Sequence, residues 1–410
     1  MTAAAHVVTV GALPGAVLAD PEGAVVAAAL MEAGVPVASR VVLDEDEAAL
    51  ERALTPDDGL TVVIAGGGSA GDVARRVVAR AVGARLVLNE RFLAALEERY
   101  RRLDRPLPRR AERLALVPQG ATTWPVDDGE PGWMLESGAR ALVVLARDGL
   151  PAALAAHLVP FARARFAGRG VVLVRTLRAA GVTLAEVEER LAEWLGAAER
   201  KGADVAVVPG DGEVWVRLRA RGATLAEVSN ILDRVEAPLR AALGDDCYGR
   251  DAESLEVVVG RLLRERRLTL ALAESCTGGL LGHRLTNVPG SSAYFERGVL
   301  VYSNRAKEEL LGVPAEILRT HGAVSAPCAE AMARSVCERA GAPCGLAITG
   351  VAGPDGGTAA KPVGTVFVGL AVAGAVTSRH FRFLGGRASV KWQSTQAAFD
   401  MLRRALKGRT

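Results

Sequence analysis

Two polar side chains with complementary chemistry, Ser275 and Lys307, follow two predicted strands. Ser275 comes soon after the apolar run Leu268–Ala273, and Lys307 lies just beyond the predicted strand Gly298–Tyr302. A serine hydroxyl becomes a useful nucleophile when a neighbouring base removes its proton. A lysine can be that base near neutral pH only if burial lowers its pKa by about three units from about 10.4, which costs about 4 kcal/mol. Together these residue types indicate acyl transfer, such as the hydrolysis of an amide without a metal ion.

The elements around Ser275 would present it at the edge of a sheet. The segment Glu274–Gly279 reads ESCTGG and separates the predicted strand from a predicted helix, Leu280–Leu285. Ligands of open α/β sheets bind at the carboxyl ends of the strands, and the amino end of a helix favours an anion. We therefore expect the backbone N–H groups of Thr277 and Gly278 to form an oxyanion hole.

The second strand is predicted to lead into a helix that begins near Lys307. Asn304 is a plausible N-cap, and Lys307 then lies in the first turn of the helix. A cation gains nothing from the helix dipole at that position, so the dipole also favours the neutral amine. Tyr302, at the end of the strand, could relay the proton or orient the Ser275–Lys307 pair.

Five motifs in this half of the chain closely resemble the carboxyl-terminal domain of the CinA family. They are AESCTGG, PGSSAYFERGVLVYSNRAK, HGAVS, ITGVAGPDGG and KPVGTV, in this order. The resemblance implies a cytoplasmic, homodimeric nicotinamide mononucleotide amidohydrolase (deamidase) of pyridine nucleotide recycling, that is, of NAD metabolism. It would convert nicotinamide mononucleotide into nicotinic acid mononucleotide and ammonia, with no cofactor and no metal. Matching motifs carry the family's serine, tyrosine, lysine and later arginine roles onto Ser275, Tyr302, Lys307 and Arg387.

The same resemblance suggests how the nucleotide would be held. Arg387 would meet the substrate phosphate or the developing negative charge. The loop 350–362 is rich in glycine, so its backbone can wrap closely around a ligand. The expected substrate-binding residues are Thr277, Gly278, Thr349, Gly350, Gly353, Asp355 and Gly356.

Each of these residues also has an ordinary structural interpretation that the sequence leaves open. Taken singly, Ser275 fits a helix cap, Lys307 a solvated side chain and Arg387 a surface charge. Cys276 fits a small buried thiol better than a nucleophile, because no neighbour in sequence would lower its pKa. The two nearby histidines, His283 and His321, fit packing and capping roles better than catalysis.

Composition narrows the class of protein. The chain has 410 residues, with 50 Lys and Arg against 47 Asp and Glu, a net charge of +3. This near balance makes nucleic acid an improbable obligatory partner. Five scattered cysteines without a CxxC pair are typical of reduced thiols, and no apolar run is long enough to span a membrane. At this length we expect two or three domains. The resemblance to the CinA family implies an α/β protein of three domains, at 1–166, 167–250 and 251–410.

The first domain alternates predicted strands and helices, which indicates a mostly parallel sheet. It occupies the position of the first domain of CinA proteins, a molybdopterin-binding-like α/β domain, which it resembles. Some family members hydrolyse ADP-ribose with this domain. The family's glycine turn with two aspartates and a threonine is degenerate here: Asp72 remains, and Ala74 stands in place of the threonine. The family also has an acidic residue in a turn near the amino terminus, and here residues 11–15, GALPG, stand in its place without an acid. Because metal-assisted hydrolysis of a pyrophosphate needs several carboxylates, we expect a structural role, with ADP-ribose pyrophosphatase activity as the alternative.

The middle segment resembles the small KH-like α+β domain of CinA proteins. Two TLAEV stretches, at 183–187 and 224–228, predict capping boxes that open helices to Leu195 and Leu243. No GXXG loop lies between these helices, so we expect a rigid spacer or a dimer-forming role, with RNA binding as the alternative. The family's competence-related name adds a last alternative, a non-enzymatic scaffold for DNA uptake or recombination.

Overall fold

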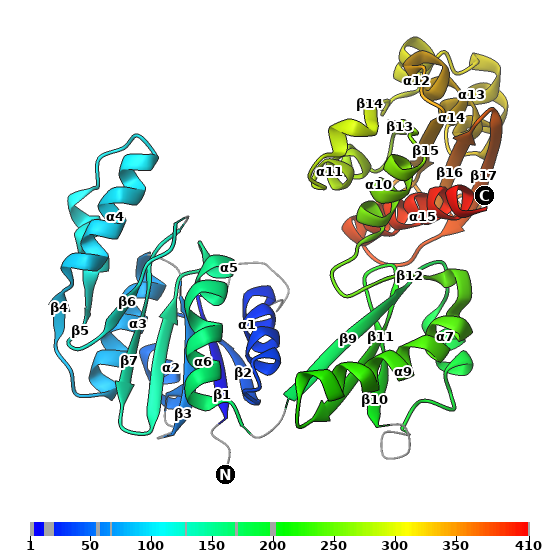
Figure 1. Ribbon diagram of the computed structural model, residues 1–410. Coiled ribbons are helices and arrows are strands. Elements are labelled where there is room, and N and C mark those ends of the chain that lie inside the picture. Colours follow the sequence, from blue (N-terminus) through cyan, green and yellow to red (C-terminus); the bar gives the residue numbers. More distant parts are fainter. Residues whose placement is uncertain are drawn as a thin grey trace. The chain divides into compact units, whose positions relative to one another are not determined.

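The computed structural model describes residues 4–11, 20–54, 58–65, 68–127, 129–168, 171–196 and 202–408. Internal packing divides the chain into two compact units, residues 1–173 with 220–230 and residues 174–219 with 231–410. Figure 1 shows the helices and strands of both units, coloured along the chain. None of the described helices combines the length and the apolar character needed to cross a membrane.

The first domain is built on a six-stranded sheet with the order β2-β1-β3-β8-β7-β6. Four strands are parallel, and β7 and β6 add an antiparallel edge, so the prediction of a mostly parallel α/β sheet is confirmed. A separate antiparallel pair, β4 and β5, is short. The strands are β1 (Ala5–Val10), β2 (Val37–Leu43), β3 (Gly59–Ala65), β4 (Leu86–Leu88), β5 (Leu116–Pro118), β6 (Thr122–Trp124), β7 (Gly132–Ser137) and β8 (Arg140–Leu145).

Helices cover both faces of this sheet. Neighbouring residues of a strand point to opposite faces, and accordingly Val7 packs with α1 and α6 while Val8 packs with α2, α3 and α4. Asp20 caps α1 by accepting the N–H of Gly23, and Pro21 takes the first helical position. The helices are α1 (Pro21–Glu32), α2 (Glu47–Ala53), α3 (Gly68–Ala81), α4 (Glu90–Arg102), α5 (Leu150–Ala153) and α6 (Val159–Phe166), with a 3₁₀ turn at Arg109–Ala115 and a π turn at Leu154–Leu158.

The glycine-rich stretch after β3 differs from its prediction. The sequence suggests a turn with a helix from Gly71, whereas α3 already begins at Gly68. Residues 66–67 and most of the replaced acidic turn, 12–15, lie outside the described residues. Asp72, the remaining aspartate, forms ion pairs with Arg75 and with Arg113, the latter at 3.2 Å. Its carboxylate is therefore held by guanidinium groups of the domain itself.

The middle segment forms a four-stranded sheet with the order β10-β11-β9-β12, and its described residues also include the helices α7 and α9. The first predicted capping box is present, because Thr183 accepts the N–H of Glu186 and Glu186 accepts that of Thr183. The helix it opens ends at Arg190 rather than Leu195, since Leu191 leaves the helical conformation. The elements are β9 (Val171–Ala179), α7 (Leu184–Arg190), β10 (Ala203–Pro209), β11 (Val214–Gly222), α9 (Leu225–Leu243) and β12 (Cys247–Arg250), the last of which the sequence did not predict.

The C-terminal region is built on a five-stranded sheet with the order β14-β13-β15-β16-β17. The first three strands are parallel, and β16 and β17 return antiparallel. The strands are β13 (Leu270–Glu274), β14 (Phe295–Leu300), β15 (Cys344–Gly350), β16 (Thr365–Val372) and β17 (Ala375–Arg382).

Helices again cover both faces of this sheet. Leu272 packs with α10, α11 and α15, and its neighbour Ala273 packs with α12, α13 and α14. The final helix spans the predicted residues, Arg387–Lys407. The helices are α10 (Leu255–Glu265), α11 (Leu280–Thr286), α12 (Asn304–Leu311), α13 (Ala315–His321), α14 (Ala326–Ala340) and α15 (Arg387–Lys407).

Candidate active site

The three parallel strands of the C-terminal sheet bring distant residues together at one edge. Ser275 directly follows β13, and its N–H donates to the carbonyl of Ile348 on β15 at 3.0 Å. Val301 directly follows β14, and its N–H donates to the carbonyl of Glu274 at 2.8 Å. The strand ends are thus locked in register, in the place where ligands of such sheets bind.

Lys307 reaches this edge from α12 and touches Ser275. Its Nζ lies 3.0 Å from Ser275 Oγ, 2.8 Å from the carbonyl oxygen of Val301 and 3.3 Å from that of Tyr302. The residue is only 1% exposed, and burial lowers the pKa of the Lys307 amine. Among the described residues, no carboxylate forms an ion pair with it. A charged ammonium would therefore be buried without a counterion.

The three oxygens around Lys307 Nζ can accept from an ammonium, and they equally suit the uncharged amine that burial favours. A neutral amine carries two N–H groups and one lone pair. The carbonyls of Val301 and Tyr302 can accept both N–H groups, which leaves the lone pair directed at the hydroxyl of Ser275. The arrangement can therefore take the proton of Ser275 when the hydroxyl attacks.

The start of α12 differs from the prediction in two details. Ser303, not Asn304, is the N-cap, because its Oγ accepts the N–H of Ala306 at 3.0 Å. The preceding strand β14 ends at Leu300, so Tyr302 lies two residues beyond the strand rather than at its end. Ser303 is the cap because its backbone has the extended conformation of an N-cap, whereas Asn304 is already the first residue of the helix.

The turn after β13 is pinned by Glu274, whose role the sequence did not reveal. Its buried carboxylate accepts the N–H groups of Gly279 and Leu281, each at 3.0 Å, and that of Gly282 at 2.8 Å. The amino end of α11 is thus filled by the protein's own carboxylate. The expectation that this helix end binds an external anion is wrong.

The predicted oxyanion hole is corrected in the same turn. The N–H of Gly278 donates to the carbonyl of Ser275 at 3.1 Å, so it is not available to a ligand. Thr277 is fully buried, and its hydroxyl has no hydrogen-bond partner. Its N–H is likewise unpaired among the described residues. Because an unpaired buried polar group costs about 1–3 kcal/mol, Thr277 is an unusual feature of this turn.

Arg387 and Tyr302 form a second cluster beside the Ser275–Lys307 pair. The Arg387 guanidinium donates to the carbonyl of Gly353 at 2.7 Å and to the hydroxyl of Tyr302 at 3.1 Å. The Tyr302 side chain is 60% exposed and, within the described part of the chain, forms no hydrogen bond to Ser275 or Lys307. Tyr302 therefore meets Lys307 through its carbonyl and not through the expected hydroxyl.

The remaining predicted binding residues lie on β15 and in the loop that follows it. The hydroxyl of Thr349 donates to the carbonyl of Ala323 at 2.8 Å, so its role in this structure is internal. Gly350 tolerates no side chain, because a Cβ would stand 2.7 Å from the carbonyl oxygen of Thr365. Asp355 and Gly356 are exposed, and the carboxylate of Asp355 has no partner among the described residues. Among the described residues, Asp355 makes no hydrogen bond or ion pair with Ser275 or Lys307.

Lys391 is a further cation at this edge that was not among the predicted site residues. A Cβ on Gly278 would lie 3.6 Å from Lys391 Nζ, so this amine lies over the turn that begins with Ser275. Lys391 follows Arg387 by one helical turn, and it forms no ion pair within the described ranges. The signal in the sequence was the i, i+4 spacing of two cations at the start of a helix, where the dipole does not favour them.

Other nucleophiles and metal ligands are less well placed. Burial raises the pKa of the Cys276 thiol to about 12, so the thiolate is disfavoured. His283 bonds to Asn287 on its own helix. In the part of the chain that the structure describes, no three His, Cys, Asp or Glu side chains are grouped to hold a metal ion.

Known proteins similar to this chain cover nearly its whole length. The profile of the CinA C-terminal domain matches residues 252–406, that of the damage-inducible protein CinA KH domain matches 174–249, and that of a probable molybdopterin binding domain matches 7–167. A CinA-like protein of Solibacter usitatus is 38% identical over 403 residues, which are 95% of each chain. The chain belongs to the CinA family.

Two further relatives agree. A CinA-like protein of Geobacter sulfurreducens is 40% identical and covers 94% of this chain and 95% of its own. A putative competence-damage inducible protein of Symbiobacterium thermophilum is 40% identical, with 92% and 93% covered. The mixed α/β fold predicted for a CinA protein, with its molybdopterin-binding-like, KH-like and C-terminal CinA parts, is confirmed.

Proposed function

We propose that this CinA protein hydrolyses the carboxamide of nicotinamide mononucleotide to nicotinic acid mononucleotide and ammonia. The observation that carries the proposal is the buried contact of 3.0 Å between Ser275 Oγ and Lys307 Nζ. Among the described residues, no carboxylate pairs with the Lys307 amine. The family resemblance of the surrounding motifs supplies the substrate. No metal ion takes part in the proposed steps.

Ser275 attacks the carboxamide carbon while its proton passes to the neutral amine of Lys307. The tetrahedral intermediate then expels ammonia, which leaves with the proton that Lys307 received. An ester between Ser275 and the nicotinoyl group remains. Lys307 removes a proton from water, the hydroxide attacks the ester, and Ser275 regains its proton as the acid leaves.

Groups around the pair account for binding and charge stabilisation. Arg387 and Lys391 lie one turn apart at the amino end of α15 and can neutralise the substrate phosphate. The N–H and hydroxyl of Thr277, unpaired among the described residues, are two donors in the Ser275 turn that would stabilise the oxyanion. The backbone of the loop around Gly353 would pack against the ribose.

The test is ammonia release from nicotinamide mononucleotide by the full chain without added metal. We expect Ser275→Ala and Lys307→Met each to lower kcat by about a thousandfold or more, because each removes one half of the nucleophile–base unit. Methionine is the sharper replacement for Lys307, since it fills the buried space without a lone pair. Lys407→Met, at the exposed end of α15, is the matched control and should keep full activity.

Two outcomes would contradict the proposal. If the wild-type chain releases no ammonia, nicotinamide mononucleotide is not its substrate. If folded Ser275 and Lys307 variants still release ammonia, the proposed mechanism is wrong. Because Lys307 acts without its proton, kcat/KM should rise with pH through a pKa below the ordinary lysine value. The Arg387→Ala variant should raise KM for the nucleotide more than for nicotinamide riboside, which lacks the phosphate.

A further inference from the structure

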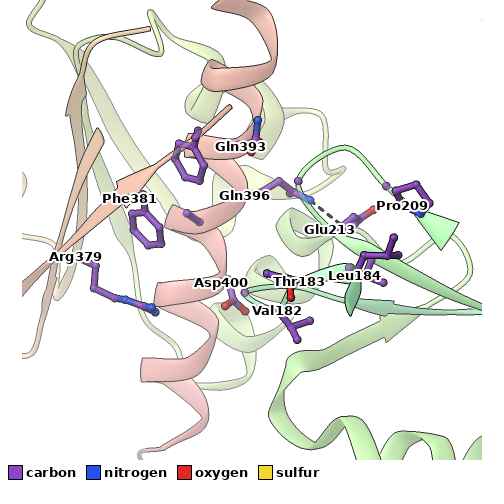
Figure 2. A pocket seen from close by; sticks show the side chains of 17 residues that line it. Val182, Thr183, Leu184, Pro209, Glu213, Arg379, Phe381, Gln393, Gln396 and Asp400 are labelled. Carbon is purple, nitrogen blue, oxygen red and sulfur yellow. Dashed lines mark hydrogen bonds between the residues drawn. The ribbon is translucent and has the colours of Figure 1, made fainter. Parts of the chain in front are cut away.

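A cavity away from the Ser275–Lys307 pair lies between the C-terminal sheet and two loops of the KH-like part. It has a volume of about 540 Å³, within the usual range of about 300–1,000 Å³ for small-molecule sites. Figure 2 shows its lining side chains, from β17, α15 and the loops around Thr183 and Glu213. All of these residues belong to one compact unit.

One wall of the cavity is a row of planar groups on the edge strand. Arg379, Phe381 and Phe383 alternate along β17 and just beyond it, so all three point to the same side of the sheet. The Arg379 guanidinium lies 5.2 Å from the Phe381 ring centre, and the two phenyl rings stack at 5.4 Å with 9° between their planes. The guanidinium is thereby held in place at one end of an aromatic row.

The charges of the cavity leave this guanidinium without an acidic partner. Asp400 also lines the cavity, but its carboxylate is bound by Arg403 and Arg404. Glu213 is likewise engaged, by Arg178 and by the hydroxyl of Tyr248. Arg379 has no ion pair or hydrogen bond within the described residues. An anion entering the cavity would therefore find a free guanidinium and carboxylates that are already neutralised.

The rest of the lining suits a small ring system with polar edges. Val182, Leu184 and Pro209 supply apolar surface from the KH-like side. On α15, both N–H bonds of the Gln393 amide are committed, to Leu384 and Ser389, while its Oε1 accepts no hydrogen bond within the described residues. That oxygen can accept from an exocyclic amine or a sugar hydroxyl.

We propose that this cavity binds a mononucleotide. The phosphate would lie in the fork of the Arg379 guanidinium, and the base would lie against the edges of Phe381 and Phe383, which favour the face of another ring. A lone aromatic acid would leave much of the volume empty, and a phosphate without a base would leave the aromatic wall unused.

The test measures binding by equilibrium dialysis with the full chain, using radiolabelled 5′-AMP and, separately, nicotinic acid mononucleotide. We expect at least one of the two to bind, and Arg379→Ala to weaken that binding about tenfold or more through loss of the charge-assisted contact. Phe381→Leu should also weaken it. Arg297→Ala, an exposed arginine on the opposite edge strand β14, is the control and should leave binding unchanged.

Each outcome decides the proposal. Competition by adenosine or ribose 5-phosphate should be at least tenfold weaker than by the whole nucleotide. Failure of both nucleotides to bind, or equal binding by wild type and a folded Arg379→Ala variant, would overturn the assignment. Nicotinic acid mononucleotide is also the product of the proposed amidohydrolase reaction and would bind beside Ser275 as well. The binding assigned to this cavity is therefore the part that Arg379→Ala and Phe381→Leu remove and that Arg387→Ala leaves in place, which separates it from the proposed reaction.

Discussion

The same local pattern occurs at the end of β13 and at the end of β3, with different chemistry. Each is a fully buried strand, followed in sequence by a glycine-containing segment and then by a helix. One carboxylate lies near each strand end, Glu274 as the last residue of β13 and Asp72 in helix α3. Glu274 binds backbone N–H groups, whereas Asp72 pairs with Arg75 and Arg113.

A buried strand that leads into a helix therefore becomes a candidate site only through partners from elsewhere in the chain. At β13, the carboxylate fixes the backbone, and a buried amine from α12 then meets the free hydroxyl of Ser275. At β3, guanidinium groups neutralise the carboxylate, and nothing reactive is left unpaired at Asp72. Three substitutions test this comparison.

The largest effect on stability is expected for Glu274→Ala. It leaves three N–H groups without their charged acceptor, and hydrogen bonds to charged groups contribute about 1.5–3 kcal/mol each, although not additively. We expect a loss of about 3 kcal/mol in the free energy of unfolding, measured in urea, together with loss of ammonia release. Glu274→Gln, which keeps one acceptor oxygen, should lose less; equal stability of Glu274→Ala and wild type would refute the pinning role.

A smaller effect, and of opposite sign for folding and activity, is expected for Thr277→Val. Valine replaces a buried hydroxyl that has no partner, so stability should be unchanged or higher by about 1 kcal/mol. If the hydroxyl stabilises the oxyanion, kcat should fall by about ten- to a hundredfold. A variant that is clearly less stable, with unaltered kcat, would show that Thr277 serves only the fold.

The smallest effect is expected for Asp72→Ala. Arg113 is half exposed, but Arg75 is mostly buried and would lose its carboxylate, so the cost should be about 1 kcal/mol. Ammonia release should stay at the wild-type rate, because Asp72 belongs to another compact unit. A pyrophosphatase activity toward ADP-ribose that disappears with this substitution would instead give the first domain an active role.

Local patterns allowed much of the fold to be predicted, and long-range contacts account for what was missed. The sequence predicts helices at Ala326–Ala340 and Arg387–Lys407, and α14 and α15 have these bounds. Local signals mark them, namely the N-cap Ser325 for α14 and the apolar periodicity for both. The contact of Lys391 with the Ser275 turn joins segments more than a hundred residues apart, so spacing could only hint at it. The hydrogen bonds of Glu274 depend on how the turn folds back onto a carboxylate, which residue types alone do not specify.

The protonation state of Lys307 is the most direct measure of the central claim. The chain has only five lysines, so carbon-13 labelling of their ε-carbons gives a simple NMR spectrum, and Lys307→Met assigns the signal. Burial without a counterion should place the pKa of Lys307 below those of the other lysines, and Ser275→Ala should shift its signal. A Lys307 that titrates near the ordinary value of about 10.4, unaffected by Ser275→Ala, would contradict the account.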